Sequence, residues 1–186
     1  KGKVTYPCDV QPKLDGVRCL AQWDNGKIEL TSRSGKPYVC PHIAEELAKV
    51  LPKGIILDGE IYVHGETFQE VTRLVKKIRP ESKNLSLWGY DIIHTDMMNA
   101  TWDQRRVWLE NFFSANEMEH GPLNNLVLVL TEEAHSEAEV LTAQAKYMQD
   151  GYEGAIVRLR TGVYRWGYRS DALLKVKTFK DKEFKI

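Results

Sequence analysis

The spacing of hydrophobic residues along the chain predicts several helices. From Phe68 to Ile78, apolar residues recur on one face at helical spacing, which predicts an amphipathic helix over residues 68–78. A shorter helix is expected over residues 42–51. Helix start signals of the capping-box kind, a Ser or Thr followed three residues later by Glu or Gln, occur at Thr67, Thr101 and Ser136. The sequence therefore predicts a helix after each of these three positions.

Short runs rich in β-branched and aromatic residues, bounded by Gly, Asn or Pro, lie between these helices. They predict strands over residues 54–63, 85–93, 126–130, 154–159 and 173–179. Two further runs flank Asn25-Gly26, a pair that tolerates the positive φ angles of a tight hairpin turn. The irregular mixture of helices and strands, with at least one hairpin, predicts an α+β fold with largely antiparallel sheets.

Composition indicates one folded domain without an overall charge bias. The 186 residues are 42% hydrophobic and 28% charged, and Lys plus Arg equals Asp plus Glu at 26 each. A neutral chain has no global field that would hold a polyanion, so any contact with nucleic acid must come from a local basic patch. The charge balance is therefore evidence against a free-standing DNA-binding protein.

Cysteine usage and hydropathy indicate an intracellular protein. Cys8, Cys19 and Cys40 are odd in number and lack the paired spacing of a zinc site, which indicates reduced, structural thiols. No apolar run reaches the length of a membrane span, and the first residues do not resemble a signal peptide. We therefore expect a cytoplasmic protein that binds no membrane.

The stretch QPKLDGVR, residues 11–18, is the most informative for chemistry. Lys13 and Arg18 bracket an Asp-Gly turn directly before the predicted hairpin. A lysine becomes a nucleophile when nearby cations or desolvation lower its pKa, and it then attacks an electrophilic phosphorus or carbonyl carbon. Taken alone, the stretch favours an ordinary surface turn, because Asp-Gly flanked by charges is common.

Two predicted strands place like charges side by side. Asp58 and Glu60 are two residues apart, so both carboxylates point to one face of their strand. Such a pair repels unless a cation or sugar hydroxyls lie between the two, which indicates a ligand or metal site; a half-solvated edge strand explains the pair equally well. Lys175 and Lys177 repeat the arrangement with positive charge, which suits a phosphate.

Two further residues give weaker signals. Glu153 stands just ahead of a predicted strand, and Tyr90 lies within one. A lone Glu is usually solvated, and an aromatic residue in a strand more often belongs to the core than to a surface that stacks on a base. Neither residue indicates a site without the others.

In their order along the chain, these stretches resemble the motif series of covalent nucleotidyltransferases, the superfamily of ATP-dependent DNA ligases, RNA ligases and mRNA capping enzymes. The matching stretches are Lys13–Arg18 for the KxDGxR nucleophile motif, then Ser32–Gly35, Leu57–Glu60, Tyr90-Asp91, Glu153–Arg158 and Leu174–Lys177. Agreement at six ordered sites is very improbable by chance, and it covers nearly the whole chain. The LLKVKTF ending and the stretch YEGAIVR are most similar to DNA ligases of the small bacteriophage or viral type.

The resemblance implies a fold and a domain organisation. It implies an ATP-grasp-like nucleotidyltransferase domain with two antiparallel sheets flanked by helices and the nucleotide in the cleft between them. Residues 1–186 would form this adenylation domain, and an oligonucleotide-binding (OB) fold domain, absent from the sequence, would follow Ile186. A monomer in the cytoplasm of a bacterial or phage-infected host cell is expected.

The resemblance also implies a mechanism with ATP as AMP donor and Mg²⁺ as cofactor. Lys13 would attack the α-phosphate of ATP, AMP would pass to the 5′-phosphate at a nick in duplex DNA, and the 3′-hydroxyl would displace AMP. Lys175 and Lys177 would hold the α-phosphate and lower the pKa of Lys13. Glu60 and Glu153 would hold Mg²⁺ directly or through water.

The remaining roles concern the nucleotide and the DNA. Tyr90 would stack on adenine and Arg18 would hold the ribose, with Gln11, Leu14 and Glu60 also in the nucleotide site. Ser32 and Arg33 would grip the 5′-phosphate of the nicked strand. Gln11 departs from the family pattern, because related ligases often carry Glu there, and its contact with the adenine amino group is open.

Two alternatives remain beside the DNA ligase prediction. An RNA ligase or a capping guanylyltransferase would share the lysine chemistry, and a capping enzyme would take label from GTP rather than ATP. A ligase-like fold that only binds nucleotide is weakened by the full set of expected catalytic residues between Lys13 and Lys177.

Overall fold

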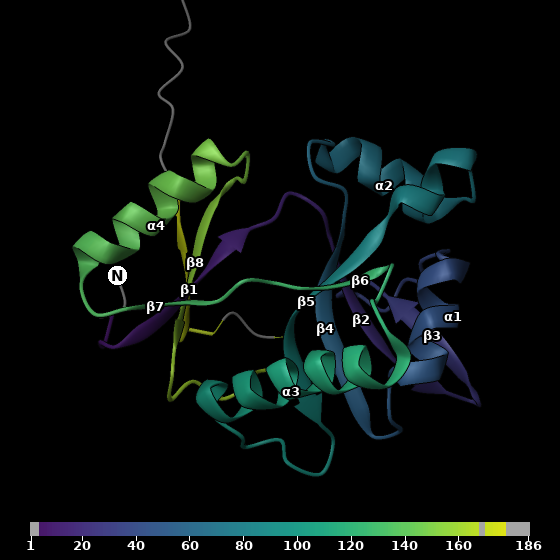
Figure 1. Cartoon of the computed structure of the whole chain (residues 1–186), viewed down its shortest axis with the longest axis horizontal. Helices are drawn as coiled ribbons and strands as arrows, with labels where there is room; N and C mark the ends of the chain where they lie inside the picture. Colours follow the sequence, from purple (N-terminus) through teal and green to yellow (C-terminus); the bar gives the residue numbers. More distant parts are fainter. Residues whose placement is uncertain (1–3, 168–169, 178–186) are drawn as a thin grey trace, which may run out of the picture.

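The computed structural model describes residues 4–167 and 170–177, which form two β-sheets and the helices packed against them (Figure 1). The first sheet is antiparallel throughout, in the order β7 (Glu132–Ala134), β1 (Cys8–Lys13), β8 (Gly154–Leu159), β9 (Leu173–Val176). The second sheet has the order β3 (Lys27–Thr31), β2 (Val17–Asp24), β4 (Ile55–Tyr62), β5 (Ser86–His94), β6 (Leu126–Leu128). Its pairs are antiparallel except β5 with β6, so the predicted α+β class is confirmed.

In the described part of the chain, four α-helices cover the sheets. They are α1 (Pro41–Val50), α2 (Phe68–Lys76), α3 (Trp102–His120) and α4 (Glu137–Gln149), and a short 3-10 helix, η1, spans Pro80–Asn84. All three predicted start signals are confirmed: the side chains of Thr67 and Ser136 accept hydrogen bonds from the backbone three residues on, and Thr101 forms a capping box with Gln104. Each cap satisfies backbone N–H groups that the first helical turn leaves without a partner.

Most predicted strands are present with small differences at their ends. The strand expected over residues 126–130 ends at Leu128, and Leu130 is exposed. The strand expected over residues 173–179 ends at Val176, and residues 178–179 lie outside the described residues. The hairpin is confirmed: Asn25 and Gly26 both have positive φ between β2 and β3.

Two strands of the first sheet, β1 and β7, were not predicted. Pro12 argues against a strand at residues 8–13, because proline lacks the N–H that a sheet requires. The structure tolerates it because β7 pairs only with Cys8–Val10, so at Pro12 the strand has a neighbour on one side alone. The second missed strand, β7, has only three residues and no alternation of apolar and polar side chains.

The core consists of two main clusters, one for each sheet. The larger packs the second sheet against α1, α2 and α3, and the smaller packs the first sheet against α4. The three cysteines are buried free thiols within these clusters, as predicted. Within the described part of the chain, every helix is too short or too polar to cross a bilayer.

Helix α3 connects the two sheets. Figure 1 shows it running beneath both, and its first residue, Trp102, donates from its indole Nε1 to Oδ2 of the fully buried Asp9 in β1 at 2.8 Å. Further along, Phe112 and Phe113 belong to the core of the second sheet. The helix therefore fixes the position of one sheet relative to the other.

A β-bulge in β5 sits where the second sheet faces the first. Pairing passes from Asp58–Asp91 to Gly59–Gly89, so Tyr90 is an extra residue opposite β4. The close approach leaves no room for a side chain at Gly59, because a Cβ there would lie 2.5 Å from the carbonyl oxygen of Trp88. Glycine at this position is thus a condition for the bulge that presents Tyr90.

We predict that Gly59→Ala destabilises the fold by about 1–3 kcal/mol, because the added methyl overlaps the neighbouring strand. Denaturant unfolding measures the loss. The matched control is Gly26→Asn in the hairpin turn, where nothing lies within 4 Å and Asn tolerates the positive φ; it should cost less than about 1 kcal/mol. Equal losses in the two variants would contradict the close approach at Gly59.

Candidate active site

A cleft of about 890 Å³ lies between the two sheets and is lined by residues of both. Residues that the sequence assigned to the site and that line the cleft are Gln11, Lys13, Leu14, Arg18, Arg33, Glu60, Tyr90 and Lys175. Ser32, Glu153 and Lys177 are not among the lining residues. Eight of the eleven residues assigned from the sequence therefore meet at one cleft.

Lys13 stands at the end of β1, opposite Gly154 of β8. The backbone of Glu153 donates to the carbonyl oxygen of Lys13 at 3.0 Å, which fixes the turn before β8 beside the lysine. The carboxylate of Glu153 contacts the Nζ atoms of both Lys13 and Lys177. Two ammonium groups thus share one carboxylate, and Glu153 faces the lysine rather than solvent.

The contact with the Glu153 carboxylate favours the charged form of Lys13, whereas burial and the neighbouring lysines favour the neutral amine. The side chain of Lys13 is only 13% exposed. Burial, followed by the positive charges of Lys177 and Lys175, lowers the pKa of Lys13 from 10.5 to about 8. The two lysines therefore act on Lys13 in the predicted direction, but desolvation, which the sequence could not show, is the larger cause. A pKa of about 8 leaves a useful fraction of free amine near neutral pH.

Glu60 and the Asp-Gly turn form the opposite wall. The N–H of Gly16 donates to Oε1 of Glu60 at 3.0 Å, and a Cβ at Gly16 would lie 2.4 Å from the carbonyl oxygen of Ile61. The turn therefore requires glycine in order to lie against β4. Burial raises the pKa of Glu60 to about 7, against the lowering effects of the Gly16 N–H and of Lys13.

Arg18 is engaged by a carboxylate within the protein. It donates to both oxygens of Asp58 at 3.0 and 2.7 Å, and the hydroxyl of Tyr164 donates to Asp58 at 2.7 Å. Asp58 and Glu60 both line the cleft, as the strand spacing predicted. A cation does lie beside the carboxylate pair, but it is Arg18 of the neighbouring strand.

Sequence reasoning missed several cleft residues. Asp91 and Arg158 lie within two of the motifs but were given no role, and both line the cleft. Trp102, Arg105 and Tyr164 also line it and lie outside every motif. In the sequence, Arg105 of α3 cannot be distinguished from a solvated charge on the exposed face of a helix. Only the structure shows that it is buried at the cleft.

A model of the family described as "ATP dependent DNA ligase domain" matches residues 4–177. The chain belongs to this family.

Relatives and solved structures agree with the assignment. The DNA ligase of African swine fever virus (isolate Warthog/Namibia/Wart80/1980) is 32% identical over 183 residues, covering 94% of this chain and 42% of that protein. The DNA ligase of Archaeoglobus fulgidus is 29% identical, covering 90% of this chain and 31% of its own length. The crystal structure of Chlorella virus DNA ligase-adenylate has a TM-score of 0.77 and 27% identity, covering 95% of this chain and 64% of that one. The chain thus spans less than half the length of the curated relatives described here.

These matches favour the DNA ligase prediction over an RNA ligase or a capping enzyme, since the family model and all three relatives are DNA ligases. They also agree with the two-sheet architecture of the ligase domain seen here. The roles of individual residues rest on the geometry of the cleft.

The predicted DNA contacts lie in the loop after β3. Arg33 lines the cleft, and its Nη2 donates to the carbonyl oxygen of Gly167 at 3.5 Å. The hydroxyl of Ser32 accepts from the backbone of Lys36 at 2.9 Å and lies 3.2 Å from the hydroxyl of Ser34. Arg33 therefore lies at the cleft, whereas the hydroxyl of Ser32 is hydrogen-bonded within its own loop.

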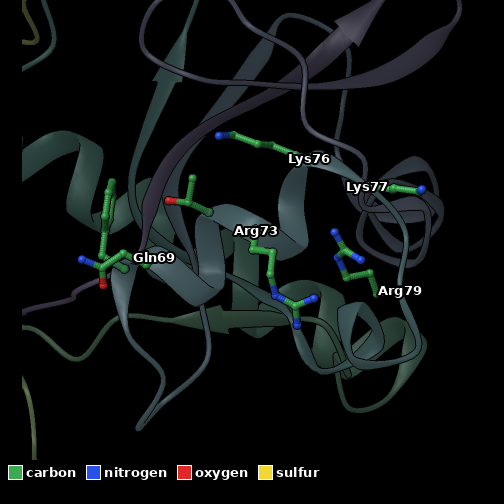
Figure 2. A pocket seen from close by; sticks show the side chains of 7 residues that line it. Gln69, Arg73, Lys76, Lys77 and Arg79 are labelled. Atoms are coloured by element: carbon green, nitrogen blue, oxygen red, sulfur yellow. The ribbon is translucent and has the colours of Figure 1, made fainter.

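Figure 2 shows a second hollow of the ligase domain, about 440 Å³ in volume, over α2 and the segment that follows. It is lined by Phe68, Gln69, Thr72, Arg73, Lys76, Lys77 and Arg79. No residue that the sequence assigned to the site lies there. Four cationic side chains line it, of which Arg73 is paired with Glu70. They form a local basic patch, the kind of surface that a neutral chain needs for contact with nucleic acid.

Among residues 4–167 and 170–177, no group of three or more His, Cys, Asp or Glu side chains could hold a metal ion by itself. Mg²⁺ commonly takes one or two protein carboxylates and completes its shell with water and substrate phosphates. Glu60 and Glu153 both lie near Lys13, the first by its charge interaction and the second by contact. The two carboxylates of Glu60 and Glu153 therefore fit Mg²⁺ only if a substrate phosphate and water supply the other ligands.

We predict that Lys13 reacts with a small acylating reagent with a midpoint near pH 8, because only the neutral amine reacts. Lys177→Met should move this midpoint upward, since removing a positive neighbour raises the pKa of Lys13. Mass spectrometry of the peptide that contains Lys13 measures the reaction. The reference is Nα-acetyl-lysine, whose side-chain amine is free. A midpoint near the ordinary lysine value of 10.5 in the unchanged chain would contradict the desolvated amine.

Proposed function

We propose that the chain is the adenylation domain of an ATP-dependent DNA ligase, in which Lys13 forms a covalent lysyl-AMP and passes AMP to the 5′-phosphate of a nick. The observation that supports it most is the buried Lys13 amine, whose pKa is lowered to about 8 within a cleft that also holds cations for a phosphate. The family match and the similarity to the Chlorella virus DNA ligase-adenylate support the same chemistry.

The first step is displacement at phosphorus. The neutral Nζ of Lys13 forms a bond to the α-phosphorus of ATP, the bond to the β-phosphate oxygen breaks, and pyrophosphate leaves. Negative charge on the phosphoryl oxygens needs positive groups fixed in place beforehand. Lys175 at the cleft and Lys177 beside Glu153 supply them.

Mg²⁺ would supply charge neutralisation at the phosphates. Glu153 and Glu60 are the carboxylates that would hold it, directly or through water. In the structure, the carboxylate of Glu153 contacts the amino groups of Lys13 and Lys177 instead. A bound nucleotide would therefore exchange lysine–carboxylate contacts for lysine–phosphate contacts at the same place.

The rest of the cleft would bind the nucleoside. Tyr90, carried into the cleft by the β5 bulge, would stack on adenine, and Gln11 and Leu14 would border the base. Arg18, already held by Asp58, would reach the ribose. These roles follow from position within the cleft and from the motif resemblance.

Nicked duplex DNA would be the acceptor. Arg33 at the cleft would contact the 5′-phosphate together with Ser32, and the basic patch over α2 offers further phosphate contacts (Figure 2). In the complete enzyme we propose a monomer in which an OB-fold domain adjoins this one, acting in the cytoplasm. The share of 42% that the chain takes up in the African swine fever virus ligase leaves room for such a domain.

We predict that Lys13→Ala abolishes covalent labelling by ATP carrying a labelled α-phosphate, because no amine remains to attack, while the far-ultraviolet circular dichroism stays unchanged. Lys27→Ala, at an exposed lysine of the hairpin, is the matched control and should label normally. The assay with labelled GTP separates a capping enzyme from a ligase. Full labelling of Lys13→Ala would disprove the assignment of the nucleophile.

We predict that Glu153→Gln slows AMP transfer on the order of 10- to 100-fold and flattens its dependence on Mg²⁺, since the amide keeps the shape but loses the charge. The measurement is the rate of labelling across a Mg²⁺ titration. Glu29→Gln, at a hairpin carboxylate that pairs with Lys27, is the control. A titration identical to that of the unchanged chain would remove Glu153 from the metal site.

A further inference from the structure

Asp91 joins the two sheets through two buried arginines. From β5, its carboxylate accepts from Arg105 of α3 (Nε to Oδ1, 2.8 Å; Nη2 to Oδ2, 3.2 Å). It also accepts from Arg158 of β8, in the other sheet (Nη1 to Oδ2, 2.8 Å). The three side chains are between 2% and 6% exposed. Because two guanidinium groups share one carboxylate, removing either arginine leaves a balanced ion pair.

Arg158 makes one contact that Arg105 does not. Its Nε donates to Oε1 of Gln11 at 2.6 Å. A guanidinium group carries donors only, so the Gln11 atom that it faces is the amide oxygen. The amide nitrogen then points to the other side, where Thr131 Oγ1 accepts at 2.9 Å and the carbonyl oxygen of Tyr90 at 3.5 Å. Both ends of the amide are thereby fixed.

The orientation of this amide matters because Gln11 lines the cleft and, in the proposed function, would border the base. It lies on the same face of β1 as Lys13, two residues earlier and so about 7 Å along the strand, and both line the cleft. Adenine presents an amino group that donates, where guanine presents a carbonyl oxygen that accepts. An amide oxygen therefore pairs with adenine and an amide nitrogen with guanine.

We propose that Arg158, anchored by Asp91, is a positioning residue that holds the Gln11 amide oxygen toward the base and so sets the preference for ATP over GTP. The inference rests on the proposed function in taking a purine nucleoside triphosphate as the ligand. The oxygen has two lone pairs, so it accepts from Arg158 and from the adenine amino group together. Without Arg158 the oxygen is no longer held, and the amide can turn over, because the Thr131 hydroxyl that accepts from the amide nitrogen can equally donate to the amide oxygen. The amide nitrogen then donates to the guanine oxygen.

The test compares two matched variants, Arg158→Met and Arg105→Met. Dissociation constants for ATP and GTP are measured by calorimetry with EDTA present, so that binding is observed without transfer. In the unchanged chain ATP binds more tightly than GTP. Arg158→Met lowers the ratio of the GTP to the ATP dissociation constant by about tenfold, the value of one hydrogen bond. Arg105→Met removes an equal buried charge from Asp91 but leaves Gln11 held, so the ratio stays unchanged while thermal stability falls.

An unchanged ratio in Arg158→Met overturns the proposal, and so does an equal fall in Arg105→Met, which would show a general loosening between the sheets. Gln11→Glu decides the matter if either arginine variant fails to fold. Its two oxygens beside Arg158 can only accept, so its ratio must not fall below that of the unchanged chain. Labelling with Mg²⁺ is run in parallel: selective binding of ATP without transfer contradicts the proposed function and leaves the role of Arg158 intact.

Discussion

The cleft exists because charged groups that are shielded from water hold two separate sheets face to face. Asp91 carries this constraint, since it comes from the second sheet and binds Arg158 of the first and Arg105 of the helix beneath both. A buried charge without its partner costs several kcal/mol, and if the sheets parted Asp91 would keep Arg105 but Arg158 would lose its carboxylate. Asp9, buried in the first sheet and bound by Trp102 of the same helix, reinforces the arrangement.

The same burial gives Lys13 its chemistry. The first sheet carries Lys13 and the second carries Glu60, and the walls of the cleft withdraw both from solvent. Desolvation favours the uncharged form of each group, so it lowers the pKa of the lysine to about 8 and raises that of the glutamate to about 7. Glu153 balances the remaining positive charge in a contact that a phosphate can replace. Burial of the cleft therefore favours the neutral, nucleophilic amine of Lys13, and the lysines that contact Glu153 can bind a phosphate in its place.

How far the sequence predicts this protein depends on whether a feature is local. The hairpin at Asn25-Gly26 and the helix caps follow from residues adjacent in the chain, and they were predicted correctly. Strand β1 was missed because Pro12 argues against a strand unless its neighbours are known. The resemblance of the ordered motifs to the ligase family indicated which residues line the cleft, and eight of them do. Arg105 was missed because its burial depends on Asp91, a partner in another element whose own burial no pattern shows.

Transfer of AMP from ATP to Lys13 can be observed by mass spectrometry of the unchanged chain. The chain is incubated with ATP and Mg²⁺, denatured, weighed intact and then fragmented to locate any added group. We expect a gain of one AMP, carried by Lys13 through a phosphorus–nitrogen bond and removed by added pyrophosphate with return of ATP. No gain in mass, or AMP on any other residue, would contradict this expectation.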